Sequence, residues 1–144
     1  MRISFAAPPF ALLLAACLAG PAVAGEATHP VLVTSEQAEG PIFDNPDAKA
    51  GERHGVAFKW FEMLKSADKS SAGVYAAEAS NSDIEAYPHD EFMYFLDGSV
   101  TLTSADGTVT RVNAGDGVTI PKGWKGNWTT GGYRKFYVIY GGSQ

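Results

Sequence analysis

The amino-acid sequence predicts an all-β protein, a single antiparallel barrel that follows an N-terminal arm. The length of 144 residues fits one domain of ordinary size and excludes an architecture of two barrels. The 16 glycines, 8 prolines and 12% aromatic residues favour strands joined by tight turns over a bundle of helices. From Val56 onward, short apolar runs alternate with turn-forming residues roughly every 8–12 positions, which is the spacing of an antiparallel sandwich or barrel.

Composition and charge exclude several classes of function. The formal net charge is -5, so the chain lacks the basic surface that nucleic-acid binding requires. With 45% apolar and 19% charged residues, the composition is that of a folded protein and not of a disordered one. The single cysteine, Cys17, cannot form an internal disulfide or a thiolate metal cluster.

The first 24 residues have the layout of a secretory signal peptide. Arg2 supplies a basic start, an apolar stretch follows, and the triplet 22–24, Ala-Val-Ala, has the small residues of a cleavage site. The stretch is too short, and too broken by two prolines, to form a stable membrane span. We therefore expect cleavage after Ala24 and a periplasmic or secreted protein. The alternative is a lipoprotein anchored through Cys17, because the segment 14–17, Leu-Ala-Ala-Cys, is similar to a lipobox.

Residues 25–55 are expected to form an extended N-terminal arm before a barrel domain that covers 56–144. Prolines and scattered acidic residues interrupt the arm, and only 31–33, Val-Leu-Val, has strand character. We expect the arm to pack on the body of the barrel or on a partner subunit. The first run of the barrel, 57–64, is interpreted as a strand because turn-forming residues follow it. One amphipathic helix through Met63 is the alternative.

The later strands are bounded by turn signals. The Asp-Gly pair at 97–98 predicts a β-hairpin, and the Gly-Gly pair at 131–132 predicts another turn. In the last strand, Phe136, Val138 and Tyr140 are expected on one face, because side chains two apart share a side of a sheet. The predicted strands are 57–64, 73–78, 84–87, 92–96, 100–103, 109–112, 118–120 and 133–140.

Two segments resemble the sequence motifs of the cupin superfamily. In 91–98, Glu-Phe-Met-Tyr-Phe-Leu-Asp-Gly, a Glu and a Gly enclose six residues, as in the second half of the first cupin motif. In 115–123, a Gly, five residues and Pro-Lys-Gly resemble the start of the second motif. The segments 124–128 and 134–138 are similar to those of the (S)-ureidoglycine aminohydrolase-like subfamily of small cupins. The resemblance implies a jelly-roll barrel, a homodimer and a ligand pocket in the barrel mouth.

The same resemblance bears on metal binding. Metal-binding cupins use two histidines and a glutamate in the first motif and one histidine in the second. By this resemblance, the first-motif histidine positions hold Glu85 and Tyr87, and the second-motif position holds Gly126. The departure implies that no cofactor is bound. The alternative is a divalent ion (manganese, iron, nickel or zinc) held by a weak donor set: Glu85, Tyr87, His89 and Glu91.

Two classes of function stay open. The first is an exported protein that binds a small polar ligand in the barrel mouth. The second is an enzyme, metal-dependent or carboxylate-based, that acts on a ureido, sugar-like or other small polar compound, with Glu91 as the candidate catalytic residue. A tryptophan in the mouth could stack on a planar or sugar-like ligand, and a lysine could offer it a cation. The predicted ligand-binding residues are Glu85, Tyr87, Glu91, Tyr94, Trp124, Trp128 and Lys135.

Overall fold

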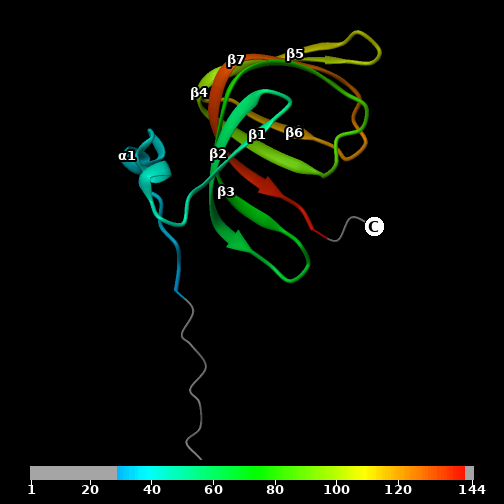
Figure 1. The fold of residues 1–144 in the computed structure, drawn as a ribbon. Coiled ribbons are helices and arrows are strands. Elements are labelled where there is room, and N and C mark those ends of the chain that lie inside the picture. The colour runs from blue at the N-terminus through cyan, green and yellow to red at the C-terminus, as the bar shows by residue number, and fades with distance from the viewer. Residues whose placement is uncertain (1–28, 142–144) are drawn as a thin grey trace, which may run out of the picture.

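A computed structural model describes residues 29–141, which fold almost entirely into antiparallel strands (Figure 1). Two short helical turns come first, the α-helix α1 (Ser35–Ala38) and the 3₁₀ turn η1 (Pro41–Asp44). Within the described part of the chain, no helix is long and apolar enough to cross a membrane. The strands are β1 (Lys49–Arg53), β2 (Val56–Lys65), β3 (Ser71–Ile84), β4 (Glu91–Ser104), β5 (Val109–Asn113), β6 (Gly117–Ile120) and β7 (Gly126–Ile139).

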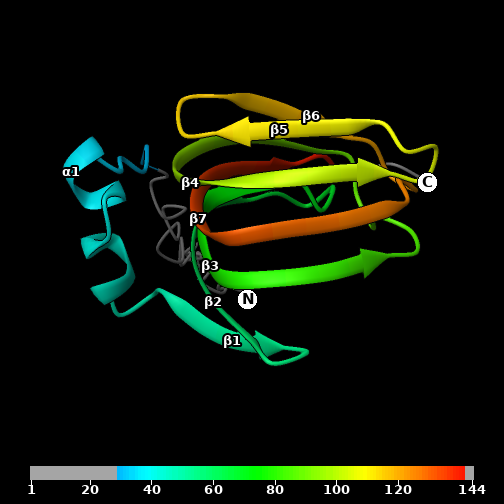
Figure 2. The same cartoon turned by 90° about the horizontal axis from the view of Figure 1, so that it is seen from above.

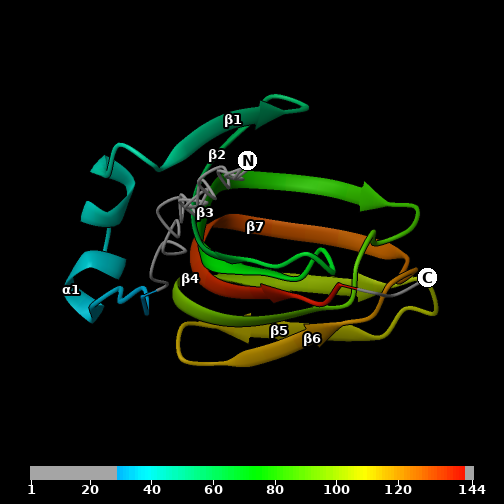
Figure 3. The same cartoon turned by 90° about the horizontal axis from the view of Figure 1, so that it is seen from below.

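The strands form one sheet that curves into a jelly-roll barrel, which confirms the predicted fold class. The sheet order is β1-β2-β3-β7-β4-β5, and β6 pairs with β4 off this path. Every pairing is antiparallel. Strands β3, β4 and β7 have 14 residues each, and β7 lies between the other two and pairs with both over most of its length. Figures 2 and 3 show β5 and β6 at one side of the barrel and β1 at the other.

The predicted hairpin at Asp97-Gly98 is wrong, because β4 continues through it. The register of β4 against β7 shifts on either side of Gly98, which is the signature of a β-bulge. Gly98 has a φ of 74°, and a Cβ atom there would lie 2.1 Å from the carbonyl oxygen of Gly132. The predicted turn at Gly131-Gly132 is wrong for the same reason, since it lies inside β7. The glycines allow two long strands to bend closely past each other.

Other strand predictions have mixed outcomes. The run 57–64 lies within β2, so the strand is confirmed over the alternative helix. The turn at 105–107 is confirmed, and there the Asp106 carboxylate accepts a hydrogen bond from the Thr108 amide. The predicted strand 84–87 is wrong beyond Ile84, where β3 ends. The amide of Tyr87 donates instead to the carbonyl oxygen of Trp124, so the loop after β3 is hydrogen-bonded to the loop that precedes β7.

Two hydrophobic clusters stabilise opposite faces of the sheet. The inner one fills the barrel beside β5 and β6, where Met93 and Phe95 are both 0% exposed. The outer one contains Ile42, Phe61 and Val74 and lies under the N-terminal arm. The inner cluster consists of Met93, Phe95, Val100, Leu102, Val112, Ile120 and Trp128.

The arm is less extended than the sequence predicts. Helix α1 begins with a capping box in which the side chains of Thr34 and Gln37 each accept a hydrogen bond from the other's backbone amide. Residues 31–33 are not a strand, whereas β1 pairs with β2 and so belongs to the sheet although it lies in the predicted arm. The arm packs on the body of its own chain, where the Arg134 side chain donates to the carbonyl oxygen of Glu39. Residues 1–24, including Cys17, lie outside the described residues.

Candidate functional site

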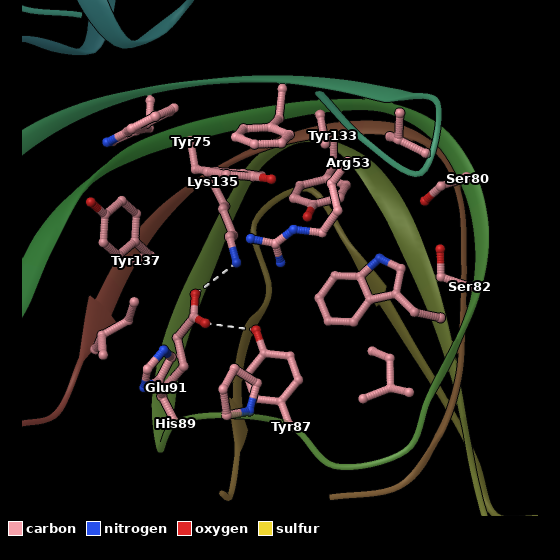
Figure 4. Close-up of a pocket in the computed structure, with 18 of the residues that line it drawn as sticks. Arg53, Tyr75, Ser80, Ser82, Tyr87, His89, Glu91, Tyr133, Lys135 and Tyr137 are labelled. Carbon is pink, nitrogen blue, oxygen red and sulfur yellow. Dashed lines mark hydrogen bonds and ion pairs between the residues drawn. The ribbon is translucent and has the colours of Figure 1, made fainter. Parts of the chain in front are cut away.

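A cavity of about 770 Å³ opens inside the barrel, on the inner face of β1, β2, β3 and β7 (Figure 4). The loop that joins β3 to β4 closes one side of it, through Tyr87, Pro88 and His89. This volume lies within the range of roughly 300–1,000 Å³ that is common for small-molecule sites. Its aromatic lining consists of Phe58, Trp60, Tyr75, Tyr87, Trp128, Tyr133 and Tyr137.

The alternation of side chains along each strand places these residues in the cavity. On β7, Tyr133, Lys135 and Tyr137 line the cavity, whereas Phe136 packs with the outer cluster. On β2, Phe58 and Trp60 likewise face inward. One sheet therefore has a face for the arm and a face for the cavity. In β7, Phe136 is on the outward face, and the polar side chains of Tyr133, Lys135 and Tyr137 are on the inward face.

A buried polar network lies at the base of the cavity. The ammonium of Lys135 donates to Glu91 Oε1 across 2.7 Å, and the hydroxyl of Tyr87 donates to Glu91 Oε2 across 2.6 Å. The two charged side chains are only 6% and 7% exposed. Both oxygens of the carboxylate are thus engaged, and the pair satisfies the rule that a buried charge needs a hydrogen-bonded partner.

Lys135 is also surrounded by aromatic rings. Its Nζ atom lies 5.3 Å from the centre of the Tyr75 ring, 5.8 Å from that of Trp128 and 5.7 Å from that of Tyr133. These distances allow cation–π attraction from three sides. A further contact, 3.1 Å long, joins Nζ to the sulfur of Met93. The ammonium therefore sits in an aromatic cage that is closed by the Glu91 carboxylate.

Burial changes the acid–base properties of these groups. Burial lowers the pKa of Lys135, and the neighbouring Glu91 carboxylate partly opposes that shift. Burial, followed by the charge of Glu91, raises the pKa of Tyr87 well above its usual value. Burial likewise raises the pKa of Tyr133, and it raises that of Tyr137 to about 12. The phenols consequently remain proton donors at every physiological pH.

The structure brings together four of the seven predicted ligand-binding residues. Tyr87, Glu91, Trp128 and Lys135 line the cavity, and so does His89, which is otherwise exposed. The remaining three residues do not line the cavity.

Each of these three has a physical reason for its position. Glu85 follows the end of β3 and is exposed to solvent. Tyr94 alternates with Met93 and Phe95, so it lies on the outer face of β4 and is 42% exposed. Trp124 packs against the inner cluster, and its indole nitrogen donates to the Ser104 hydroxyl.

Several cavity residues were not predicted from the sequence. Tyr75, Tyr133 and Tyr137 belong to this group, together with Phe58 and Trp60. The signal was available in part, because Tyr133, Lys135 and Tyr137 follow one another at intervals of two. Arg53, at the β1–β2 turn, also reaches the cavity, and Figure 4 shows its guanidinium directed into the interior.

The donor set does not fit a divalent ion. Within residues 29–141, no group of three or more His, Cys, Asp and Glu side chains is arranged to hold a metal. Glu91, the central residue of the predicted set, points both oxygens at Lys135 and Tyr87, while Glu85 points into solvent. The Lys135 ammonium already lies 2.7 Å from Glu91 Oε1, so a metal ion at Glu91 would have to displace that ammonium or be repelled by its positive charge.

A single jelly-roll barrel with a ligand-sized cavity between its strands defines a protein of the cupin class. The chain belongs to the family of EutQ-like cupin domains, because the model of that family matches residues 64–137, about half of the chain. The match begins at the end of β2, contains β3, β4, β5 and β6 in full and ends within β7, and it includes Glu91 and Lys135.

Solved structures share this fold. A protein of unknown function from Pseudomonas syringae pv. tomato has a TM-score of 0.56 and 23% identity, over 65% of this chain and 44% of that one. The EutQ protein of Clostridium difficile has a TM-score of 0.51 and 20% identity, over 62% of this chain and 71% of that one. The Salmonella typhimurium protein described as a putative ethanolamine utilization protein has a TM-score of 0.50 and 22% identity, over 61% and 71%.

These likenesses concern the fold alone. The aligned region spans less than half the length of the Pseudomonas protein. A comparison with curated proteins found no match.

Proposed function

We propose that this protein binds a small polar organic molecule in the barrel cavity, and that the ligand has a planar or apolar body. The single observation that carries the proposal is the Glu91–Lys135–Tyr87 network at the base of a cavity with aromatic walls. Aromatic walls favour the body of such a ligand, and the few polar groups at the base orient it. Arg53, at the rim, adds a cation for an acidic group of the ligand.

The proposal extends to the predicted location and assembly. We propose that the chain is exported and is cleaved after Ala24, which the layout of residues 1–24 supports. We also propose that the protein forms a homodimer, as the cupin resemblance implies. Intact-mass measurement of the exported product tests the cleavage, since a lipidated Cys17 would give a different N-terminus and mass.

The binding test combines native mass spectrometry with titration of tryptophan fluorescence. The panel consists of an aromatic acid (4-hydroxybenzoate), a ureido compound (N-carbamoylglycine) and a monosaccharide (galactose). We expect one ligand per chain and quenching of the tryptophan fluorescence, to which Trp60 and Trp128 in the cavity contribute, with loss of both in Glu91→Gln. Tyr94→Phe, an outer-face variant, is the matched control and should bind as the wild type does. Equal binding by wild type and Glu91→Gln would contradict the location of the site.

The second candidate is the enzyme of the ureidoglycine aminohydrolase-like kind, in a carboxylate-based form. The observation that favours a carboxylate is the buried Glu91, which is held by two proton donors. Turnover of N-carbamoylglycine, lost in Glu91→Gln while thermal stability holds, would support this function. Binding of that compound without any turnover would favour the binding protein.

A further inference from the structure

One feature of the cavity goes beyond ligand binding, namely the position of the Lys135 amine. Within residues 29–141, Lys135 is the only buried lysine, yet it lines the cavity. Its Nζ atom therefore faces the space that a ligand enters, while aromatic side chains exclude bulk water from it. A desolvated amine beside a proton acceptor has the arrangement of a lysine nucleophile.

We propose that Lys135 forms a reversible Schiff base with a small aldehyde that enters the cavity. This inference rests on the proposed function, because the cavity has to admit the aldehyde before the amine can react. It adds a covalent step and a class of compound, an aldehyde with a planar or apolar body.

The network contains a partner for each proton transfer. The ammonium of Lys135 gives a proton to Glu91 Oε1, 2.7 Å away, and becomes a neutral amine. The lone pair of the amine attacks the carbonyl carbon, and the C–N bond forms as the C=O π bond opens. Glu91 returns its proton to the carbonyl oxygen, which gives a carbinolamine. Nothing is oxidised or reduced in these steps.

Loss of water completes the reaction. The nitrogen of the carbinolamine passes a proton to Glu91, which delivers it to the hydroxyl group. The C–O bond then breaks, water leaves, and the nitrogen lone pair forms the C=N bond. In sum, an aldehyde and an ammonium give a protonated imine and one water, and Glu91 ends as a carboxylate. Tyr87 donates to Glu91 Oε2 throughout and holds the carboxylate in place.

The surroundings of Lys135 favour both the attack of the neutral amine and the protonated imine that forms at the end of the reaction. Burial lowers the pKa of the amine, which increases the neutral fraction that can attack. The protonated imine carries the same single charge as the ammonium, so the rings of Tyr75, Trp128 and Tyr133 stabilise it in the same way. The ion pair with Glu91 is retained.

The test traps the imine in the purified protein. The protein is incubated at neutral pH with 4-hydroxybenzaldehyde and sodium cyanoborohydride, which reduces imines to stable secondary amines. Intact mass and peptide mapping then count and locate the adducts. We expect one fast adduct at Lys135 and only slow labelling of the exposed Lys59, because burial lowers the pKa of Lys135 and leaves more of its amine neutral.

Variants and a non-reactive analogue separate the possible causes. Lys135→Arg keeps the charge of the pair and should abolish the fast adduct, whereas Lys59→Arg should leave it unchanged. If Lys135 and Lys59 of the wild type were labelled at the same rate, the Schiff-base proposal would be wrong, and this result does not depend on whether any variant folds. Saturable binding of 4-hydroxybenzyl alcohol with no adduct would overturn the Schiff base alone and leave the proposed function standing. Absence of both binding and adduct would count against both proposals.

Discussion

Lys135 Nζ and Glu91 Oε1 meet 2.7 Å apart, although the two residues are 44 positions apart in the chain and are not opposite each other on their strands. Lys135 is paired with Phe95, so its side chain extends along the inner face of β4, past Met93, to reach Glu91. The ion pair therefore joins the two long central strands and forms the base of the cavity at the same time.

Removing one partner of this pair should destabilise the protein more than removing both. Lys135→Met leaves Glu91 buried without a counter-charge, which costs about 3–5 kcal/mol by analogy with other buried pairs. The double variant Lys135→Met with Glu91→Gln removes that charge and should recover a large part of the loss. Urea unfolding at neutral pH measures both. Equal stability of the single and double variants would show that the charge of Glu91 is not the cause.

Alkaline pH should unfold the protein before the buried phenols ionise. Burial raises the pKa of Tyr137 from 10.0 to about 12, and it also raises those of Tyr87 and Tyr133. The unfolded chain releases these protons first, so stability is lost as pH rises from 10 toward 12. The lowered pKa of Lys135 has the opposite effect, since it makes stability rise with pH, but this effect ends near pH 10.5, the ordinary pKa of a lysine.

The measurement is urea unfolding across the alkaline range, with phenolate absorbance followed in parallel. Tyr137→Phe should reduce the fall in stability, whereas Tyr140→Phe should not, because Tyr140 is 52% exposed. Early phenolate absorbance from all tyrosines in a protein that retains its native circular dichroism would contradict the prediction.

The bulge at Gly98 should not tolerate a side chain. In Gly98→Ala, the new Cβ would meet the carbonyl oxygen of Gly132 at 2.1 Å, and both are backbone positions that cannot simply rotate away. We expect a loss of at least about 3 kcal/mol, at the high end for single substitutions. Gly107→Ala is the matched control, because Gly107 also has a positive φ, 86°, but no atom within 4 Å of a new Cβ. It should cost only about 1–2 kcal/mol.

The arm should contribute to the stability of the barrel on which it packs. Ile42 is 4% exposed and contacts the outer cluster, so Ile42→Ala should cost about 2–5 kcal/mol. Leu32 belongs to the same arm but is 78% exposed, and Leu32→Ala should change stability by less than about 0.5 kcal/mol. Thermal unfolding of both variants checks the difference. Equal, small effects would show that the arm does not rest on its own barrel.

The sequence by itself determined the class of fold and part of the site. Alternating apolar positions and frequent turn residues were sufficient to predict antiparallel strands, because the period of two is a local property of extended backbone. The cupin-like motif indicates Glu91, and Lys135 is predicted as a ligand-binding residue although its alternation with Phe136 does not decide which of the two points into the pocket. Glu91 and Lys135 both line the cavity.

Only the tertiary structure decided which glycines bend a strand and which end it. Asp97-Gly98 and Asp106-Gly107 have the same local sequence, yet the first lies in a bulge of β4 and the second lies in a turn. The difference is made by Gly132, which packs against Gly98 from the distant strand β7. Local sequence cannot specify such a contact. The same reason explains the cage around Lys135. Strand β7 itself supplies the rings of Trp128 and Tyr133, but the Tyr75 ring comes from β3 and the Glu91 carboxylate from β4, and only closure of the barrel brings these strands together.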